Sequence, residues 1–367
     1  MICKRIQISN FRNIETADVR FADGVNILAG ANAQGKTNLL EAVFYVALGK
    51  SFRTSHDEDL IRFGAELCKI SMDYADSQRE QNITVRLMAG KRRRIEHNRV
   101  RLAKVSEVVG LFRTVLFCPE HLSLVKDGPA ERRGFLDVAI SQIYPNYLRS
   151  LQNYNQALKQ RNRLIRDAES DRRTFDETAE MWSAQLAHEA AIIAQYRWRY
   201  VEKLQAAVRA CFEEMTDGKE VPNTVYEPSI HIEAAACEDA AATEKLYFEK
   251  LMSNHEREIA AGSTLWGTHK DDIRIDLNGK PARLFASQGQ QRSLALAMKL
   301  AEGAICQEIC GEVPAFLFDD VFSELDAARR AYLSEKIRGK QVIITSCEPS
   351  LAAGKHIRVE NGTYTEE

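Results

Sequence analysis

The stretch GANAQGKTNLLEAVFYVALG, residues 30–49, joins a glycine-bounded loop to a long apolar segment. Its first eight residues match the pattern G-x-x-x-x-G-K-[ST], and the short apolar run ADGVNILA precedes them. In this strand–loop–helix context the glycines let successive backbone N–H groups point at phosphate oxygens, and the following helix adds its positive dipole end. A simple glycine turn with an exposed lysine would not explain this context. The stretch therefore predicts a nucleotide-phosphate site and a helix from Lys36 to about Leu48.

Each position of the loop has an expected role. Lys36 is expected to contact the β- and γ-phosphates of a nucleotide, and Thr37 to place its hydroxyl on Mg²⁺. The residues expected to bind the nucleotide are Gly30, Ala31, Asn32, Ala33, Gln34, Gly35, Lys36 and Thr37.

A second motif supplies the acids that such a loop needs. The run AFLFDD, residues 315–320, indicates a buried strand with two acids at its carboxyl end, where ligands of open α/β sheets bind. We expect Asp319 to hold Mg²⁺ and Asp320 to orient the attacking water, so that Lys36 and Asp320 are the catalytic residues. Paired acids also occur at plain helix N-termini, and the phosphate loop on the same chain favours the metal role.

The pattern of apolar residues changes between these motifs. Apolar residues recur at helical spacing from about residue 128 to residue 261, whereas strand patterns come before and after. The predicted fold is α/β, with mixed sheets and flanking helices and an inserted α-helical lobe. Residues 1–127 would hold the loop and an antiparallel sheet, residues 128–261 the helical lobe, and residues 262–367 the rest of the α/β part.

Composition narrows the classes of protein. No apolar run approaches the roughly 20 residues that a membrane helix needs, and no signal peptide is visible. The eight cysteines form no C-x-x-C pair, which argues against a zinc knuckle and a disulfide framework and favours a reduced, cytosolic compartment. Because the net charge is −2, any binding of nucleic acid must use a local basic patch.

A third motif opens an apolar helix with SQGQ, residues 287–290. A serine hydroxyl, a glycine N–H and a helix dipole together make a second phosphate site, although a capped helix is the commoner explanation. Ahead of the strand with two acids, the motif resembles the signature loop of ABC-type ATPases, which binds the γ-phosphate of ATP held by the other subunit. The resemblance implies this role for Ser287, Gln288, Gly289 and Gln290. In VFSELD it implies a D-loop at the same interface, with Ser323 and Asp326.

Six stretches follow the order that they have in the RecF family, the bacterial recombination-mediator ATPases related to the heads of SMC-type proteins. They are NFRNIE, GANAQGKTNLLEAVFYVALGKSFRT, FCPEHLSLVKDGPAERRGFLD, GTHKDDIRI, FASQGQQRSLALAMKLAE and FLFDDVFSELD. The resemblance covers nearly the whole chain and is weakest in the helical region and at the C-terminus. It implies an ABC-type P-loop ATPase head with a short helical arm.

The resemblance also implies a function. It suggests a weak, DNA-stimulated ATPase that uses ATP and Mg²⁺ as a switch in recombinational repair and replication restart. An ATP-dependent homodimer would close on DNA at gaps, where double- and single-stranded DNA meet. RecR and RecO would be its partners in loading RecA, and its location would be cytoplasmic and nucleoid-associated, with no membrane partner.

Three positions depart from the general ABC pattern. Asp320 stands where transport ATPases usually carry Glu, and the shorter side chain predicts slow hydrolysis. Glu120 stands where the Q-loop Gln belongs. The stretch QVIITSCEPS, residues 341–350, lacks the usual switch His, which leaves Thr345 or Ser346 to contact the γ-phosphate. The open alternatives are the ATPase subunit of an ABC transporter, a compact P-loop kinase and a non-hydrolysing scaffold.

Basic residues gather in GKRRRIEHNRVRL, residues 90–102, which is predicted to be a hairpin. Contact of such a cluster with DNA phosphates would be independent of base sequence and sensitive to salt, whereas the alternative is a solvated strand face. The candidates for DNA contact are Arg53, Lys91, Arg92, Arg93, Arg94, Arg132 and Arg133. The motif GTHKDDIRI, residues 267–275, is assigned no chemistry.

Overall fold

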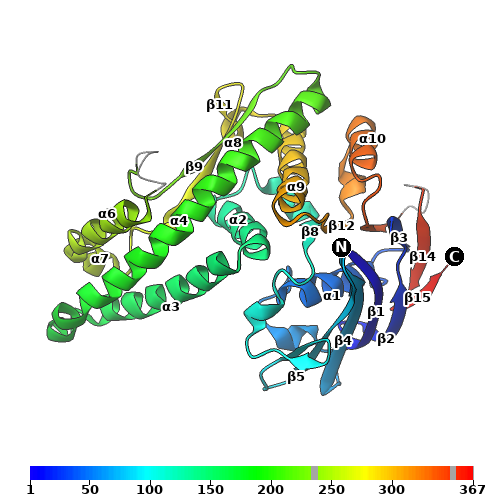
Figure 1. Ribbon diagram of the computed structural model, residues 1–367, viewed down its shortest axis with the longest axis horizontal. Helices are drawn as coiled ribbons and strands as arrows, with labels where there is room; N and C mark the ends of the chain where they lie inside the picture. The colour runs from blue at the N-terminus through cyan, green and yellow to red at the C-terminus, as the bar shows by residue number, and fades with distance from the viewer. Residues whose placement is uncertain (233–238, 348–352, 367) are drawn as a thin grey trace. The chain divides into compact units, whose positions relative to one another are not determined.

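A computed structural model describes residues 1–232, 239–347 and 353–366 of the protein (Figure 1). The last three residues of QVIITSCEPS lie outside this range. The chain forms two compact units, residues 1–123 with 292–367 and residues 124–291. The first boundary lies close to the predicted one at residue 128. The second lies well beyond residue 261, because β10 (Asp272–Leu277) pairs with β9 (Pro222–Glu227) inside the second unit.

A parallel sheet forms the centre of the first unit, in the order β15-β14-β3-β13-β12-β8. Only β15 runs antiparallel to its neighbour, at the edge. Strands β3, β8, β12 and β13 are almost continuously buried, as expected of parallel strands covered on both faces. The strands are β3 Val25–Ala29, β8 Thr114–Phe117, β12 Ala315–Asp319, β13 Val342–Ser346, β14 Lys355–Glu360 and β15 Thr363–Glu366.

An antiparallel sheet, in the order β2-β1-β4-β5-β6-β7, forms the second layer of this unit. Buried and exposed residues alternate along β4, so one face of the sheet packs on the core. The predicted basic hairpin is β6–β7, which turns through positive φ at Asn98 and Arg99, whereas Lys91 to Arg93 precede it in the β5–β6 connection. The strands are β1 Ile2–Phe11, β2 Ile14–Arg20, β4 Leu67–Ala75, β5 Glu80–Met88, β6 Arg94–His97 and β7 Val100–Arg101.

Helix α1 (Lys36–Leu48) begins and ends where the sequence predicts. It is buried almost all round because it contacts strands of both sheets, including β4 and β13. The buried Glu41 carboxylate of α1 accepts two hydrogen bonds from Arg12, at 3.0 and 2.8 Å. The other helical segments of this unit are η1 Asp57–Leu60, η2 Val105–Val108, η3 Pro119–Ser123, most of α9 Gln288–Cys310, η5 Val321–Glu324 and α10 Ala327–Lys336.

The second unit is mainly helical. Helix α3 contacts α4, and α6 packs on α4 (Figure 1). These helices lie where the sequence predicts helical spacing, but a small sheet of β9, β10 and β11 lies among them. The elements not yet given are α2 Pro129–Ile143, α3 Pro145–Asp167, α4 Arg172–Thr216, α6 Ala240–Met252, α7 His255–Ala261, η4 Thr268–Lys270, β11 Lys280–Pro281 and α8 Ala282–Phe285.

Candidate functional site

The carboxyl ends of β3, β13 and β12 meet at one edge of the parallel sheet. Ala29 pairs with Ser346, and Thr345 pairs with Asp319, so residues 30–37 leave β3 beside these side chains. A cavity of about 420 Å³ lies there, lined by residues of the loop and by Asp320, Thr345 and Arg53 among others. The structure thus brings together the loop and the acids that the sequence predicts to share a site.

The Lys36 side chain is buried against the loop itself. Its Nζ donates to the Gly30 carbonyl at 2.6 Å and to the Ala31 carbonyl at 2.8 Å, and it lies 3.4 Å from Cys347 Sγ. A phosphate oxygen is a stronger acceptor for an ammonium than a neutral carbonyl. The lysine can therefore exchange these carbonyls for phosphate when a nucleotide enters.

Asp319 is held by two hydroxyls. Thr37 Oγ1 donates to Asp319 Oδ1 at 2.7 Å, Thr345 Oγ1 donates to the same oxygen at 2.8 Å, and Asp320 N donates to Thr345 Oγ1 at 2.9 Å. Burial raises the pKa of the Asp319 carboxyl, the two hydroxyls offset part of the rise, and Glu120 and Asp320 add to it. A buried carboxylate among other carboxylates favours a cation beside it.

The donor atoms at Asp319 suit Mg²⁺. Magnesium usually takes one or two protein oxygens and completes its shell with water and phosphate oxygens. Thr37 and Asp319 offer a hydroxyl and a carboxylate whose oxygens are 2.7 Å apart. Within the described ranges no group of three or more His, Cys, Asp or Glu could hold a metal. With two neighbouring protein oxygens, Thr37 and Asp319 fit an ion that shares its shell with bound phosphates.

Sequence reasoning missed several residues that line or support the cavity. The Asn13 side-chain oxygen accepts from Asn38 Nδ2 at 2.7 Å, and Arg53 donates to Asn38 Oδ1 at 2.8 Å. Cys347 directly follows β13 and donates to Asn32 Oδ1 at 2.9 Å. The sequence could have indicated Cys347, because it directly follows the strand whose end usually carries the switch His in ABC-type ATPases.

The signature-loop residues lie in the second unit, at the start of α9. Ser287 N donates to Gln290 Oε1 at 2.7 Å, and Gln290 N donates to Ser287 Oγ at 3.3 Å. This reciprocal pattern is a capping box, so the geometry of a capped helix is present. Ser287 and Gln288 remain exposed.

The D-loop residues organise the chain after Asp320. Ser323 Oγ donates to the Asp320 carbonyl at 2.6 Å. Asp326 is the N-cap of α10 and accepts from Arg329 N at 2.9 Å. Both side chains therefore have local roles in the isolated chain.

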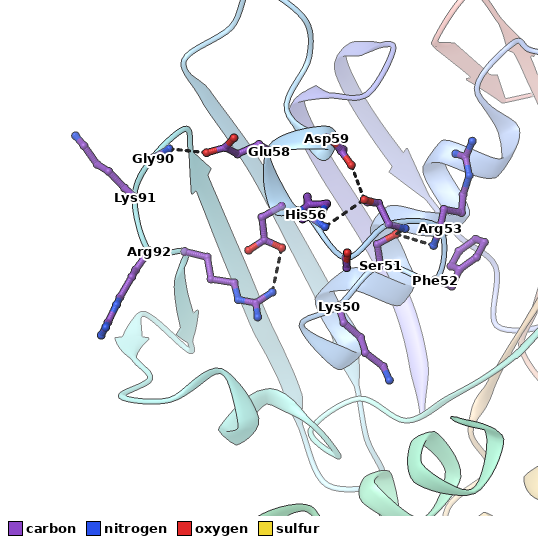
Figure 2. A pocket seen from close by; sticks show the side chains of 14 residues that line it. Lys50, Ser51, Phe52, Arg53, His56, Glu58, Asp59, Gly90, Lys91 and Arg92 are labelled. Carbon is purple, nitrogen blue, oxygen red and sulfur yellow. Dashed lines mark hydrogen bonds and ion pairs between the residues drawn. The ribbon is translucent and has the colours of Figure 1, made fainter. Parts of the chain in front are cut away.

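Two of the basic candidates are free to meet a ligand. Lys91, Arg92 and Arg93 line a cavity of about 1090 Å³. Arg93 donates to Tyr45 Oη at 3.0 Å and to Asp57 Oδ1 at 3.1 Å. Figure 2 shows Lys91 and Arg92 extending away from the other lining side chains, and neither side chain forms an ion pair or hydrogen bond with a described residue.

Two further candidates, Arg94 and Arg53, each form an ion pair with a glutamate of the first unit. Arg94 pairs with Glu96 at 2.8 Å yet stays about half exposed. Arg53 pairs with the buried Glu41 at 3.2 Å and lines both the larger and the smaller cavity.

Arg132 does not fit a role in DNA contact. Its side chain is buried and donates twice to the Asp272 carboxylate, at 2.7 and 2.8 Å. Arg133 donates to the Asp271 carbonyl at 2.8 Å. Arg132 is therefore withdrawn as a candidate, because leaving Asp272 would separate a well-paired and largely desolvated ion pair.

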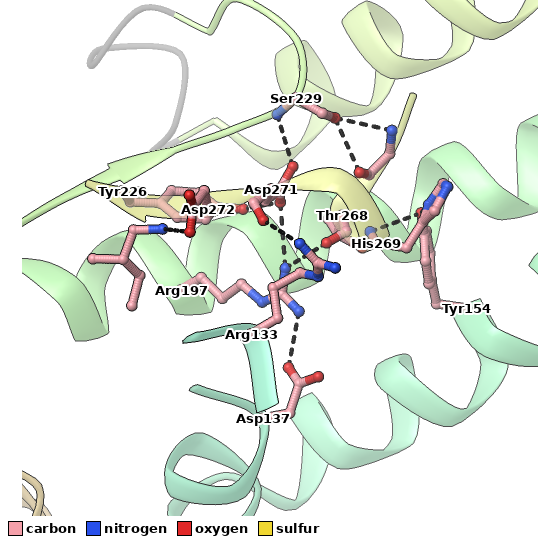
Figure 3. Close-up of polar contacts among 12 residues, drawn as sticks. Arg133, Asp137, Tyr154, Arg197, Tyr226, Ser229, Thr268, His269, Asp271 and Asp272 are labelled. Carbon is pink, nitrogen blue, oxygen red and sulfur yellow. Dashed lines mark hydrogen bonds and ion pairs between the residues drawn. The ribbon is translucent and has the colours of Figure 1, made fainter. Parts of the chain in front are cut away.

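The motif GTHKDDIRI forms the polar centre of the second unit (Figure 3). The buried Asp271 carboxylate accepts from Ser229 N at 2.7 Å, from Tyr226 Oη and from Arg197 at 3.3 Å. Arg197 also pairs with Asp137 at 2.8 Å. These contacts join α2, α4 and β9, so the motif has a structural role in this unit.

Comparison with known proteins gives consistent matches along the chain. The model of the RecF/RecN/SMC N-terminal domain matches residues 2–361. The DNA replication and repair protein RecF of Acetivibrio thermocellus is 36% identical over 99% of this chain and 100% of that protein. The Bacillus cereus RecF protein is 36% identical over 99% of this chain and 98% of its own length.

Solved structures agree with these matches. A structure described as the recombination mediator protein RecF with ATPrS in the RecFOR pathway has a TM-score of 0.94 at 32% identity, over 99% of this chain and 97% of that one. A second, described as RecF with ATP, has a TM-score of 0.93 at 32% identity, over 100% and 97%. An SMC head bound to a domain of ScpA, at 16% identity and a TM-score of 0.58 over 100% and 97%, shows a shared fold. The ABC-type ATPase head predicted from the sequence is confirmed.

Proposed function

The chain belongs to the RecF/RecN/SMC family, and within it to the RecF DNA replication and repair proteins, and on this premise we propose that it is an ATP-gated clamp on DNA. Binding of ATP closes two copies around DNA, and slow hydrolysis opens them. One observation carries the proposal: the phosphate loop and Asp320 line one cavity, and Asp319 accepts a hydrogen bond from Thr37 of that loop. The RecF structures described with ATP support the choice of nucleotide.

In this proposal the chain's own side chains share the work at the nucleotide. Lys36 leaves the Gly30 and Ala31 carbonyls and binds the β- and γ-phosphates. Thr37 and Asp319 would hold Mg²⁺, which would supply positive charge to neutralise the phosphates. Asp320 orients the attacking water, with its backbone held by Thr345.

The second copy completes the site. Residues 287–290 of one copy, with their exposed serine, approach the γ-phosphate of ATP in the other copy, and Ser323 and Asp326 lie at the same interface. A ligand that binds only the closed dimer stabilises it, by about 2.7 kcal/mol at a hundredfold excess over Kd. ATP thereby controls closure.

The partners follow from the same family membership. We propose that the target is the junction between double- and single-stranded DNA at a gap, and that RecR and RecO act with this protein in loading RecA. Lys91 and Arg92 are the leading candidates for contact with DNA phosphates, because both are exposed and neither side chain pairs with a residue that the structure describes. The match to the RecF relatives covers 98% or more of the length of those proteins, which favours this function over the ATPase subunit of a transporter. No helix in the described ranges is long and apolar enough to cross a membrane.

Analytical ultracentrifugation with and without ATP tests the clamp, with wild type beside Ser287→Arg and with gapped duplex added in a second series. We expect ATP to convert the wild type to a dimer, and Ser287→Arg to bind ATP yet remain monomeric. Ser170→Arg, at an exposed turn of the same unit, is the control for the added charge and should behave as wild type.

Three results would count against the proposal. Failure of the wild type to bind ATP would remove the nucleotide site. A wild type that stays monomeric with ATP and DNA would leave residues 287–290 as an ordinary capped helix. Dimerisation of Ser287→Arg equal to that of wild type would place the interface elsewhere.

A further inference from the structure

The C-terminal hairpin, made of β14, β15 and the turn between them, contacts the end of the phosphate loop. Gly362 N donates to the Gln34 carbonyl at 2.9 Å, and Asn361 N donates to Gln34 Oε1 at 2.7 Å. The Tyr364 hydroxyl donates to the Gly35 carbonyl at 2.9 Å. Three donors of one hairpin therefore hold two consecutive residues of the loop.

The same hairpin also lies against the start of the loop. Strand β14 pairs with β3, with Arg358 opposite Ala29. A Cβ atom added at Gly30 would lie 2.3 Å from the Val359 carbonyl oxygen. The first glycine is thus required by the hairpin backbone, and both ends of the loop depend on residues near the end of the chain.

The hairpin, together with the first turn of α1, determines which way the loop's N–H groups point. A planar trans peptide directs its C=O and its N–H to opposite sides. Because the hairpin binds the carbonyls of Gln34 and Gly35, the N–H groups of Gly35 and Lys36 point away from it. Gly35 has φ of 112°, a region that glycine enters without preference, so contacts of its carbonyl outside the loop help to set this orientation.

Tyr364 is suited to this task. Burial raises the pKa of its hydroxyl well above the usual range, so the group is a donor throughout the neutral range. The Gly35 carbonyl also accepts from Leu39 N at 3.1 Å, in the first turn of α1. The hydroxyl therefore acts where the loop becomes the helix.

We propose that Tyr364 is a positioning residue for nucleotide binding, which orients the phosphate loop through the Gly35 carbonyl. The inference rests on the proposed function, because it assumes that residues 30–37 bind ATP. It extends that function to a residue outside the loop and the acid motif. Tyr364 contacts neither phosphate nor metal, so its effect is expected on affinity.

The variant Tyr364→Phe tests this directly. It removes the hydroxyl and keeps the ring and the backbone pairing of Tyr364 with Val359. We expect the Kd for ATP, from isothermal titration, and the KM for hydrolysis to rise about three- to tenfold, as the loss of one net hydrogen bond implies. The turnover rate at saturating ATP should stay within about twofold of wild type, since the chemical groups are unchanged.

Controls separate positioning from general stability. Tyr332→Phe, on α10, removes a tyrosine hydroxyl outside the cavity lining and should leave the affinity unchanged. Without nucleotide, Tyr364→Phe and Tyr332→Phe should melt within a few degrees of each other. If Tyr364→Phe does not fold, Gln34→Ala removes the contact to Asn361 N and should raise the Kd in the same direction.

The outcomes distinguish this inference from the function on which it rests. Wild type that does not bind ATP would remove the proposed function and the inference together. Wild type and Tyr364→Phe with equal Kd would overturn the inference alone. A fall in melting temperature without nucleotide, combined with an unchanged KM, would make Tyr364 a purely structural residue.

Discussion

At the scale of single residues, one hydroxyl links the two acids of the candidate site. Thr345 is buried, donates to Asp319 Oδ1 at 2.8 Å and accepts from Asp320 N at 2.9 Å. Asp320 has φ of 51°, in the left-handed region where residues other than glycine are uncommon. The threonine therefore secures a backbone conformation that the chain does not favour by itself.

We expect Thr345→Val to destabilise the first unit and to slow ATP turnover. Valine keeps the shape but leaves Asp320 N without its acceptor, a loss of about 1–3 kcal/mol in the free energy of unfolding. Urea unfolding and steady-state hydrolysis measure the two effects. Thr345→Ser keeps the hydroxyl and is the control. A valine variant with wild-type stability and turnover would show that the hydroxyl is dispensable.

At the scale of elements, helix α9 packs closely on strand β12. Helix α9 follows the signature loop, and β12 carries Asp319. A Cβ atom at Gly303 would lie 2.4 Å from Phe316 Cζ. The ring lies on a buried strand with other aromatic rings close by, Phe318 among them at 5.9 Å between centroids. Only a residue without a side chain lets the helix approach the sheet so closely.

Gly303→Ala should therefore lower the free energy of unfolding by about 1–3 kcal/mol, because overpacking forces Phe316 or the helix to move. Gly134→Ala, in the exposed part of α2, is the matched control. It has nothing within 4 Å of the added Cβ and should raise stability by about 0.5–1 kcal/mol through better helix propensity. Denaturant unfolding of both variants gives the comparison. An alanine at position 303 as harmless as the one at position 134 would contradict the packing argument.

At the scale of the whole molecule, charge is nearly balanced, with 50 Lys and Arg against 52 Asp and Glu. Attraction to DNA must then come from local groups of cations, such as Lys91 and Arg92, whose side chains pair with no acid among the described residues. Arg93 pairs with Asp57, Arg94 with Glu96 and Arg132 with Asp272. Long-range attraction should accordingly be weak, and local contacts should dominate the salt dependence.

Lys91→Ala and Arg92→Ala should each weaken binding to gapped DNA and reduce the slope of log Kd against log salt by about 1. The effect should not depend on base sequence, because phosphate contacts carry no sequence information. Fluorescence anisotropy over a salt series measures the slope. Arg173→Ala, at an exposed arginine paired with Glu177, is the control and should leave the slope unchanged. If a variant that carries both substitutions keeps the wild-type slope, the DNA contact lies elsewhere.

Much of the nucleotide site could be predicted because its parts are contiguous motifs. The glycine loop, the helix from Lys36 and the buried strand before Asp319 each express a local preference of a few neighbouring residues. The basic candidates could not be sorted in the same way. Arg132 and Lys91 have the same charge in the sequence, but one faces Asp272 across the second unit and the other faces solvent.

The α/β class, the phosphate loop and the two acids follow from local sequence, since spacing and composition over short windows encode strand, turn and helix. Tertiary structure alone decided which distant residues complete the site. Thr345 meets Asp319 through the parallel pairing of β12 and β13. Tyr364 meets Gly35 because β14 pairs with β3 and its hairpin turns back over the loop. Such pairings depend on burial of the whole sheet, which no short window of sequence contains.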